Sequence, residues 1–242
     1  MSDLKVSVVI PTYNERDNIS ALIEKLSLLF QSRGLQGEII IVDDNSPDGT
    51  ADEAEAHARR FPVRVLRRGQ KSGLSSAVLS GFGIAGGEIL GVMDADLSHD
   101  PEAVGALVEA VTSGRAEVSV GSRYVEGGGI RDWPALRRFM SWFAILLARP
   151  LTSVRDVTSG FFFLRKEVIE GVRLSDRGFK IGLEVMAKGR YGKIVEIPYT
   201  FTDRRKGSSK LKAGEVVDYL SQLMSLYGDR IIRVLQRKSR AR

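Results

Sequence analysis

Short apolar runs alternate with helix-like patterns through the first half of the chain. Runs rich in β-branched residues predict strands at residues 6–10, 38–42, 63–66, 89–93 and 118–120. Between these runs, apolar residues recur every three or four positions, which predicts helices at residues 18–30, 50–60, 74–84 and 101–112. Strands that alternate with helices assemble into a largely parallel sheet covered on both faces, so we predict an α/β fold.

The second half of the chain is less regular. Its pattern predicts strands at residues 160–164 and 194–199, a helix at residues 135–148 and a glycine-rich loop at residues 125–129. Residues 216–235 have the apolar spacing of an amphipathic helix. Because no linker-like composition separates these segments, we predict one domain over residues 1–212, followed by a C-terminal amphipathic helix and basic tail over residues 213–242.

Acidic residues follow three of the predicted strands. Glu15 follows the first strand, Asp43 and Asp44 end the second, and Asp94 and Asp96 end the fourth. Ligands of open α/β sheets bind beyond the carboxyl ends of the strands, so we expect these carboxylates to converge on one cleft. An Asp-x-Asp pair can hold a divalent cation, which completes its coordination shell with diphosphate oxygens and water. The alternative is a turn whose aspartates cap the next helix, but the neighbouring acidic strand ends favour the cation site.

The composition excludes several kinds of site. The chain has no cysteine, which rules out disulfides, thiolate metal sites and cysteine nucleophiles and favours a reducing cytosol. Its two histidines are too few for a three-histidine metal site. The longest apolar run, residues 139–148, is too short to cross a bilayer, which takes roughly 20 residues. The first residues lack the apolar region of a signal peptide, and no phosphate-binding loop of the Gly-x-x-x-x-Gly-Lys type is present.

Positive charge is concentrated in three stretches of the chain. Lys and Arg number 36 against 30 Asp and Glu, and residues 131–155, 203–212 and 229–242 each hold five or six basic residues against one acidic residue. The rest of the chain is therefore acidic, and we expect the basic stretches to contact anions such as phosphates or lipid head groups. A nucleic-acid binder needs a broad basic face with stacking aromatic residues. Aromatic residues make up 7% of this chain, so we expect no nucleic-acid partner.

Seven segments carry motifs in a recognisable order between about residues 6 and 212. Residues 8–15 (VVIPTYNE), 42–50 (VDDNSPDGT), 93–96 (MDAD) and 121–124 (GSRY) resemble family 2 glycosyltransferases of the GT-A fold. Residues 158–161 (TSGF), 178–181 (GFKI) and 201–211 (FTDRRKGSSKL) narrow the resemblance to polyprenyl-phosphate (dolichyl-phosphate) mannose synthases. The resemblance implies a Rossmann-like GT-A catalytic domain with a mixed, largely parallel sheet flanked by helices. The complete acidic motifs argue against a non-catalytic scaffold.

The resemblance implies roles for individual residues. A nucleotide sugar is expected to contact Pro11, Tyr13, Glu15, Val42, Asp44, Asp94, Ala95 and Asp96. Mg²⁺ or Mn²⁺ is expected to be ligated by Asp94, Asp96 and Ser98, where Ser98 replaces a glutamine of some relatives. The expected catalytic residues are Asp96, Arg123, Arg137, Ser141, Arg204 and Lys210. All of these except Asp96 match positions that meet the acceptor phosphate or the donor diphosphate.

The implied reaction is a metal-dependent, inverting transfer of mannose from GDP-mannose to a polyprenyl (dolichyl) phosphate, which yields a β-linked product. The alternative is another donor such as UDP-glucose, because the motifs shared across family 2 do not distinguish donors. Arginines suit this chemistry because the planar guanidinium binds phosphate oxygens bidentately. A phosphate monoester has a second pKa of about 6 and is largely a dianion at pH 7, so the acceptor needs no general base.

Two segments are expected to meet the lipid. Residues 132–149 place Trp133 and Trp142, the only tryptophans, in an apolar helix with basic residues near both ends, which is typical of helices at a membrane interface. The alternative for this segment is a buried helix. The basic C-terminal helix is the second candidate. We therefore expect a peripheral protein on the cytoplasmic face of a membrane, or one that recruits a membrane-anchoring partner.

Overall fold

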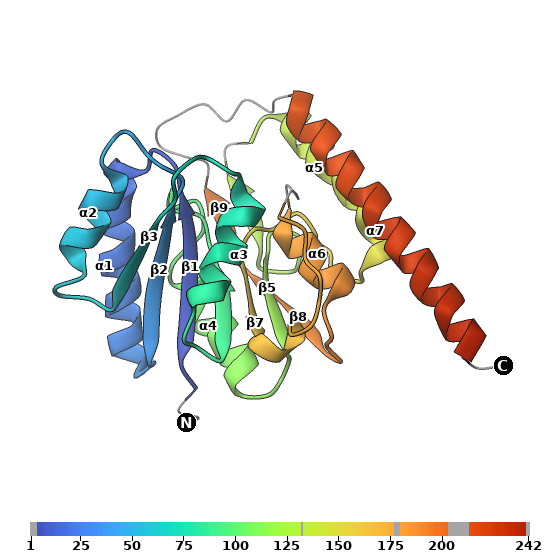
Figure 1. Ribbon diagram of the computed structural model, residues 1–242, viewed down its shortest axis with the longest axis horizontal. Helices are drawn as coiled ribbons and strands as arrows, with labels where there is room; N and C mark the ends of the chain where they lie inside the picture. Colours follow the sequence, from blue (N-terminus) through green and yellow to red (C-terminus); the bar gives the residue numbers. More distant parts are fainter. Residues whose placement is uncertain (1–3, 132, 177–179, 203–212, 241–242) are drawn as a thin grey trace.

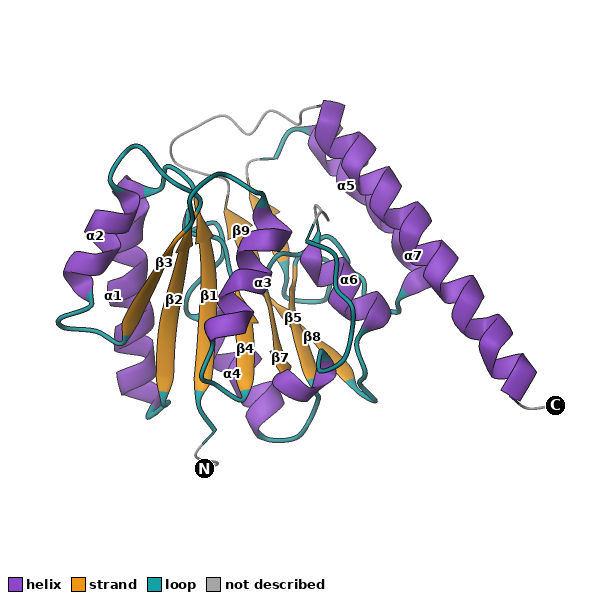
Figure 2. Ribbon diagram, viewed as in Figure 1, coloured by secondary structure: helices purple, strands orange, loops and turns teal. Residues whose placement is uncertain are grey.

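A mixed seven-stranded sheet lies at the centre of the computed structural model, which describes residues 4–131, 133–176, 180–202 and 213–240 (Figures 1 and 2). The strand order is β3-β2-β1-β4-β7-β5-β8. The strands are β1 (Val6–Thr12), β2 (Gly37–Asp43), β3 (Val63–Arg67), β4 (Ile89–Val92), β5 (Val118–Ser122), β7 (Phe162–Arg165) and β8 (Ile194–Pro198). Of these, β7 alone runs antiparallel to its neighbours β4 and β5, so the predicted largely parallel sheet is confirmed.

Helices cover both faces of this sheet. One face packs against α1 (Arg16–Arg33), α2 (Thr50–His57) and α4 (Ala103–Thr112), and the other against α3 (Leu74–Ile84), α5 (Ala135–Ala148), α6 (Ile181–Lys188) and α7 (Ala213–Arg240). Successive strand residues point to opposite faces of the sheet. Val8 and Ile10 pack on the side of α1, α2 and α4, and Val9 packs on the side of α3, α5, α6 and α7. Both faces are buried, which explains why the strands read as continuous apolar runs.

Three elements are absent from the sequence prediction. The short strands β6 (Gly129–Arg131) and β9 (Thr200–Thr202) pair in parallel as a separate two-stranded sheet, and α6 lies between β7 and β8 along the chain. Three residues are too few to show an alternating pattern. The first six residues of α6 are all buried, so it lacks the polar face that marks an amphipathic helix. Two short 3-10 helices span Arg149–Leu151 and Lys166–Val168.

The long helix α7 lies beside α5 and extends past it toward the C-terminus (Figure 1). The Tyr219 hydroxyl donates to the carbonyl oxygen of Ala144 at 2.8 Å, and the Tyr227 hydroxyl donates to that of Leu147 at 2.6 Å. The predicted amphipathic C-terminal helix is thus present and packs on the domain. In the described part of the chain, no helix is both long and apolar enough to span a membrane. The boundary after residue 212 stays a prediction.

Candidate active site

The strand ends bring the predicted acidic and basic residues to one edge of the sheet. The chain connects β1 to β2 and β3 on one side and then places β4 on the other side of β1. Open α/β sheets bind ligands at such a reversal of strand order, outside the carboxyl ends of the strands. Because β7 is antiparallel, residues 155–161 at its start reach the same edge. This edge therefore collects side chains from β1, β2, β4, β5 and the loop before β7.

Asp44 ties a second loop to the end of β2. Its Oδ1 pairs with Arg68 Nη1 at 2.8 Å, and its Oδ2 accepts hydrogen bonds from the backbone N–H groups of Ser72 and Gly73, both at 3.1 Å. Asp44 is therefore buried and fully engaged with the loop that follows β3. The neighbouring Asp43 is also buried and accepts hydrogen bonds from two hydroxyl groups, so it holds the turn rather than facing the cleft.

The end of β1 supplies an exposed aromatic ring. Tyr13 is 40% exposed, and the ammonium of Lys71 lies 3.4 Å from the centre of its ring. Pro11, two residues earlier in β1, is paired in register with the buried Val42 of β2. Glu15 is the N-cap residue of α1. These predicted nucleotide-contacting residues therefore gather at the ends of two neighbouring strands.

Asp94 and Asp96 follow β4 on a sharply turned loop. The Asp94 side chain is 36% exposed, and its Oδ2 lies 3.7 Å from Nε2 of His99. Asp96 Oδ1 accepts hydrogen bonds from the backbone N–H of Ser98 at 3.0 Å and from its hydroxyl at 2.6 Å. Between them Leu97 adopts a left-handed φ of 60°, which is costly for leucine and is held by these bonds. The buried Ser98 hydroxyl thus orients Asp96, while direct metal ligation by Ser98 stays a prediction.

His99 supports this loop from below. Its Nδ1 accepts the backbone N–H of Asp94 at 3.0 Å, and its ring stacks on Phe161 with centroids 4.9 Å apart. Burial lowers the pKa of His99, outweighing the opposite effect of the Asp94 and Asp96 charges, so the ring is neutral at pH 7. The positive charges of Arg123 and Lys180 act in the same direction as burial on this pKa.

The two carboxylates fit a hard divalent cation that shares its coordination shell with a substrate. Across the residues that the structure describes, no three His, Asp or Glu side chains form a cluster able to hold a metal ion by themselves. Mg²⁺ is commonly bound through one or two carboxylates together with substrate phosphates and water. Asp94 and Asp96 supply these two carboxylates at the end of β4.

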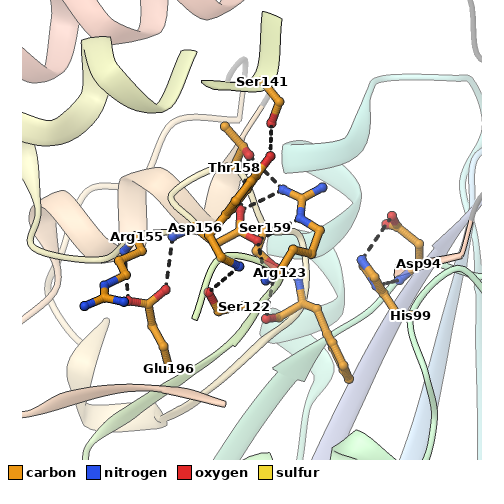
Figure 3. A network of polar contacts seen from close by, with 12 residues as sticks. Asp94, His99, Ser122, Arg123, Ser141, Arg155, Asp156, Thr158, Ser159 and Glu196 are labelled. Carbon is orange, nitrogen blue, oxygen red and sulfur yellow. Dashed lines mark hydrogen bonds and ion pairs between the residues drawn. The ribbon is translucent and has the colours of Figure 1, made fainter. Parts of the chain in front are cut away.

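Arg123 follows β5 and is gripped by the fully buried Asp156 (Figure 3). Its Nε and Nη2 donate to the two carboxylate oxygens at 2.7 Å, and Nη2 also donates to the Thr158 hydroxyl at 2.9 Å. Glu196 of β8 accepts the backbone N–H groups of Arg155 and Asp156, which fixes the loop. Burial acts to lower the pKa of Arg123, but hydrogen bonds and charge from Asp156 outweigh it and raise the pKa, so the guanidinium stays charged.

The start of α5 brings two more predicted residues beside this guanidinium. The Arg137 guanidinium lies 4.2 Å from the ring centre of Trp133, and that of Arg123 lies 5.2 Å from the same ring. The hydroxyl groups of Ser141 and Tyr124 are 2.9 Å apart. Trp133 therefore links the two arginines, and α5 is anchored to the end of β5.

Lys180 is a nearby cation that the sequence reasoning did not include. It is the N-cap residue of α6, and its charge acts on His99. The signal was present, because Lys180 belongs to the 178–181 motif that carried the resemblance. The predicted residues Arg204 and Lys210 lie outside the described residues. Ala95 is buried between the two aspartates of the acidic loop.

Sequence comparisons match this chain to a known family. Residues 7–173 match the domain described as glycosyl transferase family 2. A dolichol-phosphate mannosyltransferase from Pyrococcus furiosus is 46% identical over 92% of this chain and 64% of its own length. A protein of the same name from Saccharomyces cerevisiae is 41% identical over 93% of this chain and 87% of its own length. The chain thus spans somewhat less than two thirds of the Pyrococcus protein and most of the yeast protein.

Solved structures with low sequence identity share the fold. Glucosyl-3-phosphoglycerate synthase from Mycobacterium tuberculosis, in complex with phosphoglyceric acid, superposes with a TM-score of 0.69 at 20% identity, over 93% of this chain and 80% of that one. A mannosyltransferase from Pyrobaculum calidifontis, in complex with GDP-Man and Mn²⁺, superposes with a TM-score of 0.63 at 16% identity, over 91% of this chain and 64% of that one. These similarities confirm the predicted GT-A fold.

Proposed function

The chain belongs to glycosyl transferase family 2, and from that premise we propose that it transfers mannose from GDP-mannose to a polyprenyl phosphate such as dolichyl phosphate. One structural observation carries the proposal. The carboxylates of Asp94 and Asp96 lie at the end of β4, and the immobilised guanidinium of Arg123 lies at the end of β5. The two carboxylates suit a divalent cation, and the guanidinium suits a phosphate. Both are expected at the site of a reaction between two phosphorylated molecules.

The leaving group of this reaction is a nucleoside diphosphate, which gains negative charge as the glycosidic bond breaks. Arg123 is held in place by Asp156 before any substrate binds, so it stabilises that charge without reorganising. We assign Mg²⁺ or Mn²⁺ to Asp94 and Asp96, where the cation supplies charge neutralisation at the diphosphate. The Mn²⁺ complex of the Pyrobaculum mannosyltransferase supports this assignment.

The nucleotide is assigned to the strand ends of β1 and β2. Tyr13 offers an exposed ring face for the base, Glu15 offers a carboxylate for base or ribose groups, and the buried Asp44 contributes by holding the loop after β3 at this site. We also assign to the nucleotide Pro11 and Val42, which are paired in register near these strand ends, and Ala95, which follows Asp94. In this assignment the diphosphate points from Tyr13 toward the acidic loop, where the sugar is transferred.

The acceptor phosphate is assigned to the cations on the α5 side of the cleft. Arg137 stacks on Trp133 beside Arg123, and Ser141 lies one helical turn further along α5. A phosphate dianion attacks the anomeric carbon without a general base, and direct displacement inverts the configuration to give a β-linked product. The phosphate dianion has no proton to lose, so the reaction requires no side chain that accepts a proton next to the acceptor phosphate.

The lipid chain is assigned to the outer faces of α5 and α7. Both helices expose large apolar side chains: Leu136, Phe139, Trp142, Phe143 and Leu146 on α5, and Val217, Leu220, Met224, Ile231 and Ile232 on α7. Exposed apolar side chains beside basic residues are typical of helices in a membrane interface. We place the protein at the cytoplasmic face of a membrane. Trp133 is not part of this surface, since it packs against Phe201 in the domain core.

Transfer of labelled sugar into lipid tests the proposed function. The purified chain is incubated with polyprenyl phosphate in detergent, with labelled GDP-mannose or labelled UDP-glucose, and with Mg²⁺, Mn²⁺ or EDTA. We expect organic-phase label from GDP-mannose alone, lost with EDTA. Label from UDP-glucose instead would refute the donor assignment, and label that persists in EDTA would refute the cation assignment. Repeating the assay with added membranes reveals whether a membrane-anchoring partner is required.

A further inference from the structure

Helix α7 is attached to the catalytic domain at several points, and one of them differs from the rest. Tyr219 and Tyr227 bond to carbonyl groups of α5, and Asp229 forms an ion pair with Lys188 of α6 at 3.0 Å. Gln222 instead bonds to the backbone at the start of α6. It is therefore the α7 attachment that reaches toward the candidate active site.

The Gln222 amide makes two hydrogen bonds with a single residue. Its Oε1 accepts the backbone N–H of Lys180 at 3.0 Å, and its Nε2 donates to the carbonyl oxygen of Lys180 at 3.0 Å. Gln222 is 6% exposed, so these bonds are shielded from water. An amide carries a donor and an acceptor on separate atoms, which matches the N–H and C=O of one residue and explains why a polar side chain is buried on this face of α7.

Lys180 needs such an external support. It is the N-cap residue of α6 with φ −128° and ψ 85°, outside the helical region, and no side chain of its own caps the helix. Its carbonyl oxygen accepts a long hydrogen bond of 3.4 Å from the Glu184 N–H of α6, whereas Gln222 engages both of its backbone polar groups at 3.0 Å. Lys180 also has a further interaction, and its side chain starts from the backbone that Gln222 holds.

The start of α6 lies against the loop before β7 through a tight backbone contact. A Cβ at Gly182 would lie 2.9 Å from the carbonyl oxygen of Ser159, so glycine permits close packing of α6 on this segment. At the next residue, Gly160, a Cβ would lie 3.7 Å from Asp94 Oδ1. The contacts thus run from Gln222 through Lys180 and Gly182 to the loop beside Asp94.

We propose that Gln222 is a positioning residue that holds Lys180 toward the donor diphosphate, so that the seating of α7 sets the affinity for the nucleotide sugar. This inference rests on the proposed donor site at Asp94 and Asp96. A lysine ammonium makes strong, charge-assisted hydrogen bonds to phosphate only when its stem starts from the right place. The Gln222 amide supplies that placement from a helix whose opposite face is exposed and apolar.

Donor binding measured without any lipid tests the proposal. Calorimetry with GDP-mannose and Mn²⁺ gives the dissociation constant of the full chain and of the variant Gln222→Met, which has a similar volume and no hydrogen-bonding amide. We expect the dissociation constant to rise about tenfold. In turnover, KM for GDP-mannose should rise by the same factor while KM for the lipid phosphate stays within about twofold. The matched control is Tyr227→Phe, which removes one α7 hydrogen bond that goes to α5 and does not involve Lys180.

A double-mutant cycle separates positioning from general loosening of α7. If Gln222 acts through Lys180, Gln222→Met should weaken donor binding in the wild-type background and have almost no further effect in a Lys180→Met background. Additive effects would overturn the proposal, as would equal weakening by Tyr227→Phe. If Gln222→Met does not fold, Gln222→Glu keeps the acceptor and loses the donor, and unchanged donor affinity in that variant would also overturn the proposal.

Binding of GDP-mannose by the wild-type chain distinguishes failure of the Gln222 role from failure of the proposed function. A wild-type chain that binds GDP-mannose with Mn²⁺, together with a Gln222→Met variant of equal affinity, would overturn the role of Gln222 and leave the function standing. A wild-type chain that binds no GDP-mannose would refute the donor site and the positioning role together.

Discussion

Replacing Asp156 with asparagine tests how firmly the fold holds the guanidinium of Arg123. Asp156 is fully buried and Arg123 nearly so, with side chains 0% and 7% exposed. The carboxylate accepts two guanidinium hydrogen bonds at 2.7 Å and the backbone N–H of Arg123 at 3.0 Å. Asp156→Asn keeps the size of the side chain but removes its charge and turns one acceptor into a donor that faces another donor.

The expected loss of stability follows from burial of the remaining charge. Removing one partner of a buried ion pair costs about 3–5 kcal/mol, because the other charge stays buried without compensation. We expect a cost near the lower end of this range, about 3 kcal/mol, since the asparagine oxygen still accepts one hydrogen bond. For a chain of this size, 1 kcal/mol lowers Tm by about 2–4 °C, so Tm should fall by about 6–12 °C.

Thermal unfolding followed by circular dichroism measures this change, and the matched control is Asp52→Asn. Asp52 also pairs with an arginine, Arg67, but both side chains are about half or more exposed, so water screens the pair and Tm should hardly move. At a temperature where the Asp156→Asn variant is folded, kcat should fall about tenfold because Arg123 is no longer held. A Tm within about 2 °C of wild type, or a fall equal to that of the control, would refute the reasoning.

Three further variants probe the loop of Asp94 and Asp96, a buried carboxylate of β2 and the exposed apolar face of α5. Ser98→Ala removes the hydroxyl that orients Asp96 and should weaken Mn²⁺ affinity about tenfold by calorimetry in the presence of GDP, whereas equal affinity would contradict that role. Glu38→Gln loses a buried carboxylate whose pKa is lowered: burial opposes this shift, but hydrogen bonds and nearby lysine charge outweigh it. The ionised carboxylate therefore stabilises the fold above its ordinary pKa of 4.5 and progressively less as pH falls. The free energy of unfolding in urea should be lower in the variant than in wild type by about 1–3 kcal/mol at pH 7 and by much less near pH 3. A difference that stays constant with pH would be evidence against this role of Glu38. Phe139→Glu should release the protein from anionic vesicles in co-sedimentation, while Leu28→Glu, equally exposed on α1, should leave vesicle binding unchanged.

The regular elements of the first half were predictable because the apolar pattern that specifies each one lies within its own short segment. The run at residues 38–42 became β2 (Gly37–Asp43), and residues 74–84 became α3 with the same bounds. These elements are long enough for an apolar period to emerge. The three-residue strands β6 and β9 and the almost entirely buried α6 offer no such period, so local patterns could not reveal them.

The candidate site divides in the same way. Asp94 and Asp96 follow a strand in an open α/β sheet, so a chain position alone indicates that they face the ligand edge. The state of Asp44 was not predictable from its position, because its partner Arg68 comes from the end of the next strand and leaves it fully engaged. Metal ligation by Ser98 stays a prediction, and only the tertiary structure adds that its hydroxyl donates to Asp96.

Periodicity and short motifs are properties of neighbouring residues, and for this chain they were enough for the α/β fold, the acidic strand ends and the family. The partners that hold the site are distant along the chain: Asp156 lies 33 residues from Arg123, and Gln222 lies 42 from Lys180. These pairs exist because β7 inserts antiparallel between β4 and β5, which brings residues 155–161 to the cleft, and because α7 folds back onto α5 and α6. Strand order and helix docking come from burying the whole apolar surface at once, and no local segment records that outcome.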